Sequence, residues 1–430
     1  MNILKYETNI LDKKYFHESK IRLKKRIIRK ENNVININID EVKQTWLGMG
    51  GAITEASAYN YSLLTDDIKK EFIDAYYSVE GLNYNVGRIS IASNDFSIKP
   101  YEYTKKKDLS DFSIDHDKKY IIPLLNDIYK NKKLTLLASP WSPPKFMKNN
   151  LMLKLGGKLR KKYYSLYADY LSLFIKEYKN LGFDISYITM QNEPFATQIW
   201  ESCKYSLEEQ KDFIYNYLIK QLEDTKVILW DHNKEDIYNV VENLYEKNEK
   251  VAGVGFHWYS GGHYQNLKLI NNKYPNLLLI NTEMCCGFSK YSEIQWINDA
   301  KLYLKEIIND INSGINMFID WNILLDSTGG PNHVKNYCKS PIILDEQKQD
   351  FIKTPIYYYL KHIAIIKANS KVIHTSSYDD NLLVCALKND NNIYIVILNN
   401  SSEDKKINVV IKNNFIDDII KTNSIITYKI

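Results

Sequence analysis

Two glutamates stand directly after short apolar runs in the middle of the chain. Glu193 follows the run 186–192, and Glu283 follows the run 277–282. A carboxylate at the end of a buried strand is costly to desolvate unless it is paired or has a chemical use. Two such acids could hydrolyse a glycosidic bond, one protonating the leaving oxygen and the other attacking the sugar or directing water. The alternative is that each glutamate only caps a turn or pairs with an arginine.

Tryptophans accompany these acids along the chain. Five of the seven lie in or just after predicted strands: Trp46, Trp141, Trp230, Trp258 and Trp321. Aromatic faces stack on the flat C–H faces of sugar rings, so the pattern favours a sugar site. Core packing is the alternative, and it is the better interpretation for Trp46 and Trp230. Trp141 lies among the three prolines of 139–144, which make a stiff loop rather than a core strand.

The elements that must position these residues alternate between short apolar runs and longer helical patterns. Such alternation is typical of βαβ units and a parallel sheet. Apolar periodicity predicts helices over 163–181 and over 207–222, the latter after the capping pair Ser206 and Glu209. The predicted strands are 46–53, 85–92, 134–138, 186–192, 227–230, 253–258, 277–282 and 315–322.

Eight strands, each followed by a helix, favour an α/β fold of the (β/α)8 barrel type over an open doubly wound sheet. The sequence also lacks the Gly-rich phosphate loop that an open sheet would normally carry. In a barrel, the loops after the strands converge on one face, where active sites lie. Glu193 would end the fourth strand and Glu283 the seventh, so the two carboxylates could face each other across the barrel mouth.

The two ends of the chain differ from its middle. All glycines and tryptophans lie between residues 46 and 330. Apolar and polar residues alternate over 35–40, which predicts a strand, and further strands are predicted over 382–387, 393–398 and 407–411. We therefore expect a barrel over 41–366 and a small antiparallel β-sandwich built from 1–40 together with 367–430.

Composition excludes intrinsic disorder and indicates no particular partner. Hydrophobic residues make up 44% and charged residues 25%, as in ordinary globular chains. The net charge of +5 is too dilute, without a concentrated patch, to indicate a nucleic-acid binder. Because the N-terminus lacks the apolar segment of a signal peptide, we expect a cytoplasmic protein without stable membrane insertion, and release by another route stays open. The oligomeric state is not predicted.

The five cysteines are odd in number and show no CxxC spacing. This pattern argues against a disulfide framework or a zinc site, so reduced thiols are expected. Cys285 and Cys286 come directly after the second glutamate and its neighbour. We interpret this pair as small apolar packing without a redox role, since thiols in such surroundings are usually inert.

Two other patterns have alternative interpretations. The basic run 20–30 could attract anionic lipid or polysaccharide, but its partial alternation favours an exposed edge strand guarded by lysine and arginine. His257 and His263 with Glu283 could suggest a metal. Their spacing matches no zinc template, so we prefer hydrogen-bonded histidines of a site wall and expect neither a metal nor a cofactor.

Motifs between residues 44 and 366 resemble those of glycoside hydrolase family 30, within its glucosylceramidase-like branch. The matching segments, in order, are Gly48-Met49-Gly50-Gly51-Ala52-Ile53-Thr54-Glu55; Arg88-Ile89-Ser90-Ile91-Ala92-Ser93-Asn94-Asp95-Phe96-Ser97; Ser139-Pro140-Trp141-Ser142-Pro143-Pro144; Gln191-Asn192-Glu193-Pro194; His257-Trp258-Tyr259; Thr282-Glu283; Asp320-Trp321-Asn322; and Gly329-Gly330-Pro331-Asn332. One motif alone would indicate only a retaining-glycosidase barrel, whereas the ordered set is specific. The family's small β-sandwich from both chain ends agrees with the split domain predicted above.

The resemblance implies a role for each matching residue. Glu193 would be the acid/base and Glu283 the nucleophile of a retaining double displacement, and Asn192 would hold the sugar 2-hydroxyl. The other residues would grip the distal hydroxyls of a glucose or orient the nucleophile. Those implied to grip the sugar are Asp95, Trp141 and Trp321; those implied to orient Glu283 or line the same wall are Arg88, Tyr259 and His257; Asn336 completes the substrate-binding set.

The implied activity is that of a retaining exo-β-glycosidase, specifically a β-glucosidase of glucosylceramidase type, with a β-glycoside as its partner. His333 and the segment 316–319 stand where relatives often carry tryptophan. We expect both changes to lie near the outer rim and to affect the aglycone preference. The alternatives are another specificity of the family (β-1,6-glucanase, β-xylosidase or β-fucosidase) and, from another class, a carbohydrate-binding protein without catalysis.

Overall fold

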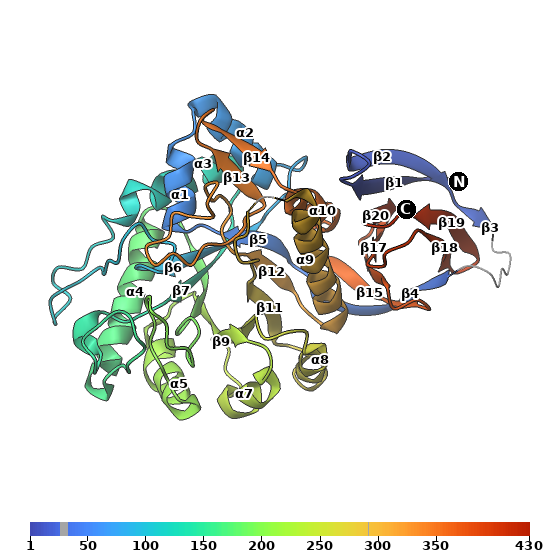
Figure 1. Cartoon of the computed structure of the whole chain (residues 1–430). Coiled ribbons are helices and arrows are strands. Elements are labelled where there is room, and N and C mark those ends of the chain that lie inside the picture. Colours follow the sequence, from blue (N-terminus) through green and yellow to red (C-terminus); the bar gives the residue numbers. More distant parts are fainter. Residues whose placement is uncertain (26–32, 291) are drawn as a thin grey trace.

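The computed structural model describes residues 1–25, 33–290 and 292–430, which form a closed barrel beside a β-sandwich (Figure 1). Neighbouring barrel strands are all parallel, and their order follows the sequence until β12 closes onto β5. The predicted (β/α)8 barrel with a side sandwich is confirmed. The barrel strands are β5 (Gly48–Ala52), β6 (Val86–Ile91), β7 (Thr135–Pro140), β8 (Ile185–Thr189), β9 (Lys226–Asn233), β10 (Val251–His257), β11 (Leu278–Glu283) and β12 (Met317–Asp320).

Helices separate the barrel strands and cover the outside of the barrel (Figure 1). They are α1 (Glu55–Ser62), α2 (Asp66–Tyr77), α3 (Ile121–Asn131), α4 (Tyr164–Asn180), α5 (Leu207–Phe213), α6 (Ile219–Gln221), α7 (Ile237–Leu244), α8 (Tyr264–Lys273), α9 (Glu293–Ser313) and α10 (Pro355–Ala364). Before α5, Ser206 accepts a hydrogen bond from the backbone N–H of Glu209, whose carboxylate accepts one from Ser206, so the predicted capping pair is present. Within the described chain, none of these helices combines the length and apolar character that crossing a bilayer requires.

Alternating side chains along the barrel strands build two inner layers. The lower layer is an apolar cluster of Val86, Leu137, Ile228, Ile280, Met317 and Ile319. Two residues further along their strands, Arg88, Ser139 and Thr282 are buried polar side chains. Because residues two apart on a strand share a face, the alternation that fills the barrel also places polar groups directly beneath the loops at its C-terminal end.

Both chain ends contribute strands to the sandwich. Strand β1 pairs with β20, and β4 lies between β15 and β18. Apolar side chains from both ends, including Ile35, Ile395 and Val409, form its core. Its strands, in spatial order, are β2 (Lys14–Arg22), β1 (Asn2–Asn9), β20 (Ile425–Lys429), β17 (Ile393–Asn399), β16 (Leu382–Lys388), β15 (Ser370–Ser377), β4 (Asn33–Trp46), β18 (Lys405–Ile411), β19 (Asn414–Ile420) and β3 (Lys24–Lys25); a separate hairpin pairs β13 (Ile342–Asp345) with β14 (Asp350–Lys353).

The first barrel strand begins later than predicted. Strand β4 continues to Trp46, which pairs with Ser370 of β15 and so ends a sandwich strand. Strand β5 begins at Gly48, whose φ of +129° is a conformation that side chains rarely permit. Trp46 and Trp230 are 1% and 3% exposed, which confirms core packing as their interpretation.

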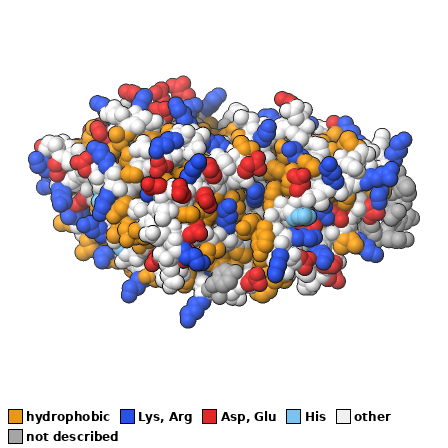
Figure 2. All heavy atoms as spheres, turned by 90° about the horizontal axis from the view of Figure 1, so that it is seen from above, with side chains coloured by type: hydrophobic (Ala, Val, Ile, Leu, Met, Phe, Trp, Pro, Cys, Tyr) orange, Lys and Arg blue, Asp and Glu red, His pale blue; other side chains and the backbone are white. Residues whose placement is uncertain are grey.

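The basic run is only partly described. Its first residues lie in β2 and β3, the two outer strands of the sandwich sheet, whereas residues 26–30 lie outside the described residues. Lys24 forms an ion pair with Asp417 of β19. In Figure 2, basic and acidic side chains are interspersed over the visible face, which does not display a field of one sign.

The histidine of α10 joins the barrel to the sandwich. His362 is fully buried, and its two ring nitrogens hydrogen-bond the hydroxyls of Thr427 in β20, at 2.8 Å, and Thr8 in β1, at 2.9 Å. When the ring is neutral, one nitrogen donates to a hydroxyl and the other accepts from the second hydroxyl. The helix thus contacts the first and the last strand of the chain through one uncharged side chain.

We expect protonation of His362 to weaken the fold. Burial lowers the pKa of His362 to about 3, whereas an unfolded histidine titrates near about 6.5. The unfolded state therefore binds the proton more readily, and the stability that the neutral histidine contributes is complete above pH ~6.5 and is lost as the pH falls toward ~3. Urea unfolding between about pH 7 and pH 4 should show a shallower loss of the free energy of unfolding for His362→Gln than for the wild type.

His17→Gln is the matched control, because His17 lies exposed on β2. It should lose stability with the same pH dependence as the wild type. If the free energies of unfolding of the wild type and of His362→Gln change equally with pH over this range, protonation of His362 does not weaken the fold.

Candidate active site

A cavity of about 400 Å³ opens at the C-terminal ends of the barrel strands. Eight of the ten residues proposed from the sequence line it, and the remaining two, Arg88 and His257, are buried and bonded to that wall. The lining residues are Asp95, Trp141, Asn192, Glu193, Gln198, Trp200, His232, Asn233, Tyr259, Glu283, Cys285, Gly287, Trp321, Asn336, Tyr337 and Cys338. The structure therefore brings the whole predicted set together, although its parts lie up to 248 residues apart in the chain.

Strained backbone lies near the ends of several strands below this cavity. Ala92, Glu193, Asp231 and Asn322 all have positive φ, between +47° and +66°, near the ends of β6, β8, β9 and β12. Each such non-glycine residue costs of the order of 1–3 kcal/mol and persists only where its surroundings enforce it. Here the backbone N–H of Glu193 donates to the carbonyl of Asp231 at 2.9 Å, which ties the end of β8 to β9.

The Arg88 guanidinium lies beneath the cavity and donates to groups from three strands. Nη1 is 2.5 Å from Oε2 of Glu283, and Nη2 is 2.8 Å from Oδ1 of Asn192 and 3.0 Å from Oδ2 of Asp231. Burial would lower the pKa of Arg88, but the carboxylates of Asp231 and Glu283 raise it above its ordinary value. The side chain therefore stays charged while it orients one glutamate and the amide next to the other.

Asp231 is a site residue that the sequence prediction missed. Besides Arg88, it accepts hydrogen bonds from Thr282 at 2.7 Å and from His257 at 3.1 Å, and its other donors are Ser139 and Thr189. Burial raises the pKa of Asp231, but the charge of Arg88 and these bonds hold it well below its usual range. A signal was present: Asp231 directly follows the apolar run 227–230, as the two glutamates follow theirs.

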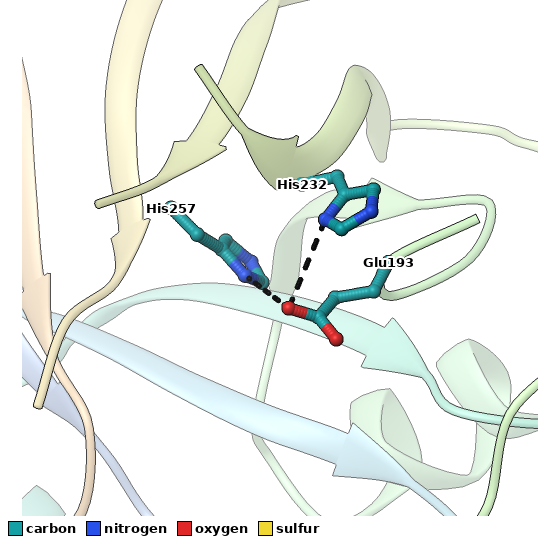
Figure 3. A group of neighbouring side chains, drawn as sticks. All are labelled: Glu193, His232 and His257. Carbon is teal, nitrogen blue, oxygen red and sulfur yellow. Dashed lines mark hydrogen bonds and ion pairs between the residues drawn. The ribbon is translucent and has the colours of Figure 1, made fainter. Parts of the chain in front are cut away.

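Glu193 lies beside two histidines (Figure 3). Its Oε1 is 3.3 Å from Nδ1 of His257 and 3.7 Å from Nδ1 of His232. Burial raises the pKa of Glu193, but the hydrogen bond and charge of His257 outweigh burial and lower it. Burial lowers the pKa of His257, but the carboxylates of Glu283, Asp231 and Glu193 raise it to about 9. These two shifts place the proton of the pair on His257 and leave Glu193 ionised beside it.

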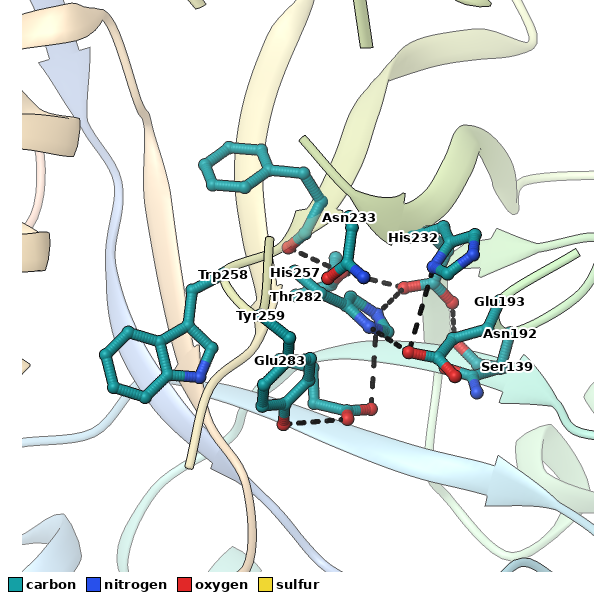
Figure 4. A network of polar contacts seen from close by, with 12 residues as sticks. Ser139, Asn192, Glu193, His232, Asn233, His257, Trp258, Tyr259, Thr282 and Glu283 are labelled. Atoms are coloured by element: carbon teal, nitrogen blue, oxygen red, sulfur yellow. Dashed lines mark hydrogen bonds and ion pairs between the residues drawn. The ribbon is translucent and has the colours of Figure 1, made fainter. Parts of the chain in front are cut away.

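Two donors fix the carboxylate of Glu283. The hydroxyl of Tyr259 donates to Oε1 at 3.0 Å (Figure 4), and Arg88 donates to Oε2. Nε2 of His257 lies 4.0 Å from the same Oε2. Burial and the nearby Glu283 hold the pKa of Tyr259 well above its usual range, so this hydroxyl remains a donor. The carboxylate is thus held in one orientation by a donor on each oxygen, as a nucleophile requires.

The opposite side of the cavity presents aromatic faces and a carboxyl group. Trp141 and Trp321 stack with ring centroids 5.4 Å apart. Asp95 accepts from Nδ2 of Asn336 at 2.9 Å. Burial raises the pKa of Asp95 to about 7, and the charges of Glu283 and Glu201 add to that rise. Aromatic faces beside a hydrogen-bonding acid can hold the C–H faces and the hydroxyls of a sugar.

The residues that depart from the family pattern lie at different depths. Met317 and Phe318 belong to β12 and are buried inside the barrel wall, so the expectation that segment 316–319 lies at the outer rim was wrong. His333 is partly exposed. Its Nε2 lies 3.4 Å from Oε2 of Glu201, and its backbone N–H donates to the carbonyl of Asp95. This histidine therefore joins the loop after β12 to the loop after β8.

The histidines group differently from the arrangement considered from the sequence. His263 is exposed and bonds the carbonyl of Ser260, away from Glu283. In the described chain, Glu193, His232 and His257 place one possible ligand atom each within 4.8 Å of one another (Figure 3). Two imidazoles and a carboxylate suit zinc, but an ion there would occupy the oxygen and nitrogens between which the proton described above is held.

Comparison with known proteins identifies the family. The TIM-barrel domain of glycosyl hydrolase family 30 matches residues 46–366, and the β-sandwich domain of that family matches residues 369–428. The lysosomal acid glucosylceramidase of Mus musculus is 31% identical over 392 residues, which cover 83% of this chain and 75% of that protein.

Two solved structures share the fold of this chain over its full length. The crystal structure of SrfJ from Salmonella typhimurium has a TM-score of 0.94 and 28% identity, covering 100% of this chain and 99% of that one. An endo-beta1,6-glucanase has a TM-score of 0.87 and 26% identity, with the same coverage of both chains. With paired glutamates in a sugar-sized cavity and both domains matched, the chain belongs to glycosyl hydrolase family 30 and is a glycoside hydrolase.

Proposed function

We propose that this glycoside hydrolase is a retaining exo-β-glycosidase, specifically a β-glucosidase of glucosylceramidase type. One observation carries the proposal: Glu193 in the loop after β8 and Glu283 at the end of β11 line a single cavity. The same cavity contains Asp95 and the stacked pair Trp141 and Trp321. The similarity to a mouse protein named as a glucosylceramidase supports the choice of a glucoside. The barrel over 41–366 and the sandwich from 1–40 with 367–430 remain the proposed domain division, with residues 41–46 of β4 as the shared segment, because they still pair with β15 of the sandwich.

In the first step, Glu283 attacks the anomeric carbon while Glu193 protonates the departing glycosidic oxygen. Arg88 and Tyr259 hold the attacking carboxylate by one oxygen each, so its orientation is set before the sugar arrives. The proton comes from the Glu193 and His257 pair, in which the two atoms lie 3.3 Å apart. The product is a glycosyl ester of Glu283 and a free alcohol.

In the second step, Glu193 takes a proton from water, which attacks the ester from the side the alcohol has left. Asn192 assists both steps. Its amide oxygen accepts from Arg88, which turns the Nδ2 group into the donor available to the sugar 2-hydroxyl. A hydrogen bond there strengthens as positive charge develops on the sugar ring, so it favours the transition state over bound substrate.

A β-1,6-glucanase is the second candidate. The observation that favours it is the match of the whole chain to a solved endo-beta1,6-glucanase. A panel of nitrophenyl β-glycosides, β-1,6-glucan and glucosylceramide distinguishes the two candidates. Hydrolysis of the glucoside and the lipid without cleavage of internal glucan bonds supports the first, and release of short oligosaccharides from β-1,6-glucan supports the second.

Replacing the proposed nucleophile should abolish turnover. In Glu283→Gln the amide cannot form the ester, so kcat for an aryl β-glucoside should fall by about 10⁴-fold or more. Glu102→Gln is the control, because Glu102 pairs with Lys145 and lies outside the cavity lining; its rate should match the wild type. Wild-type activity in Glu283→Gln would refute the assignment.

The proposed acid should show its role through the leaving group. Glu193→Ala should slow a dinitrophenyl β-glucoside least and an alkyl β-glucoside most, by about 10²–10⁴-fold, because a good leaving group needs little protonation. Equal losses for both substrates would speak against an acid role. The rates of both substrates with the wild type give the reference ratio.

Azide distinguishes the role of Glu193 from that of Glu283 by a second measurement. In Glu193→Ala, azide can replace the attacking water and should yield the β-glucosyl azide; in Glu283→Ala, azide attacks the sugar directly and should yield the α anomer. NMR of the products identifies the anomers, and the reverse pattern would exchange the two roles.

A further inference from the structure

Two cysteines meet in the wall of the cavity. Sγ of Cys285 lies 3.1 Å from Sγ of Cys338, although the residues are 53 positions apart in the chain. Both are 6% exposed, and both line the cavity that contains Glu283. The other cysteines of the chain, all of them described, are buried elsewhere: Cys203, Cys286 and Cys385.

The backbone holds the two thiols in this position. The segment after the nucleophile strand runs antiparallel to the segment 337–339: the N–H of Phe288 donates to the carbonyl of Tyr337 at 3.0 Å, and that of Lys339 donates to the carbonyl of Cys286 at 2.9 Å. A disulfide has a sulfur separation of about 2.05 Å, so bond formation requires an approach of only about 1 Å. Side-chain rotation within the existing frame can supply most of that movement.

The two cysteines lie next to residues that bind Glu283 and Asp95. The hydroxyl of Tyr259 lies 3.4 Å from Sγ of Cys285 and donates to Glu283. Cys338 follows Asn336 by two residues, and Asn336 donates to Asp95. A shift of the sulfurs therefore moves a donor of the proposed nucleophile and a partner of the proposed sugar-binding acid.

We propose that Cys285 and Cys338 form a dithiol site that peroxide oxidises reversibly to a disulfide, and that this disulfide suppresses hydrolysis. The second part rests on the proposed function, whereas the first does not. The sequence interpretation of the adjacent Cys285 and Cys286 as inert packing is revised for Cys285 alone. Cys286 packs in the barrel core near Lys339 and Asp299. Cys285 therefore contacts Cys338, and not its neighbour in the sequence, Cys286.

The oxidation balances without a further reactant. The thiolate of one cysteine attacks a peroxide oxygen, which gives a sulfenic acid and releases hydroxide. The second sulfur attacks the sulfenic sulfur and displaces its oxygen as water, so two thiols lose two electrons and one peroxide becomes two waters. The hydrogen bond with Cys338 and burial raise the pKa of the Cys285 thiol, so the reaction should be slow at neutral pH and accelerate as the pH rises.

The test treats the full chain with hydrogen peroxide and maps its peptides by mass spectrometry. We expect a peptide that joins Cys285 to Cys338, a loss of glucosidase activity of roughly 10- to 100-fold, and recovery of activity with dithiothreitol. Cys338→Val replaces the thiol by an apolar side chain that cannot be oxidised and should show neither the joined peptide nor the thiol-reversible loss, each variant being compared with its own untreated sample. Cys286→Ala should behave as the wild type.

Three results would overturn the proposal: no joined peptide under oxidation, a bond between Cys285 and Cys286 instead, or equal reversible inactivation of Cys338→Val. A joined peptide without loss of activity would support the formation of the disulfide and refute its effect on hydrolysis. Mass spectrometry detects the joined peptide without a glycoside substrate, so this measurement does not depend on the proposed function. An untreated chain that hydrolyses no glycoside would therefore count against the proposed function, while the peptide map still decides whether the disulfide forms.

Discussion

One buried cation constrains the rest of the site. The Arg88 guanidinium is almost fully buried, and its donors bind Asn192 in the loop after β8, Asp231 in β9 and Glu283 in β11. Removing it would leave the carboxylates of Asp231 and Glu283 without their arginine partner in the barrel, and breaking a buried ion pair in this way typically costs several kcal/mol. Because one rigid group reaches three strands, the carboxylate of Glu283 and the amide beside Glu193 are positioned relative to each other by the same interaction.

This arrangement also keeps the charge constant during the proposed reaction. Forming the ester neutralises the negative charge of Glu283, and transferring a proton to the leaving alcohol leaves a negative charge on the Glu193 and His257 pair. Arg88 and Asp231 stay ionised throughout, since each holds the pKa of the other in favour of the charged form. During the step, one negative charge therefore passes from Glu283 to the pair of Glu193 and His257, and the net charge of the site does not change. This avoids the large cost of adding a charge to the protein interior.

The sequence predicts those parts of the molecule that depend on local pattern. Barrel strands are apolar runs, so Glu193 and Glu283 could be recognised as residues that end them. Asp231 follows such a run too, but the polar residues after it resemble a turn, and its role depends on five donors from other strands. The contact of Cys285 with Cys338 depends on two loops whose pairing no local pattern encodes. The depth of segment 316–319 was misjudged because a motif gives residue types and not their distance from the surface.

Recognition of the aglycone can change without disturbing this chemistry, because the two depend on different parts of the fold. The charged groups come from strand ends, whereas the loops around the cavity pack on one another behind its lining, where Glu201 after β8 pairs with His333 after β12. We expect the pair of His333 and Glu201 to influence which aglycone can follow the sugar while leaving Arg88 untouched. The two regions meet at Asp95, whose carbonyl accepts from the backbone of His333. Its carboxyl faces the cavity, so the position of the sugar and the shape of the rim are coupled through one residue.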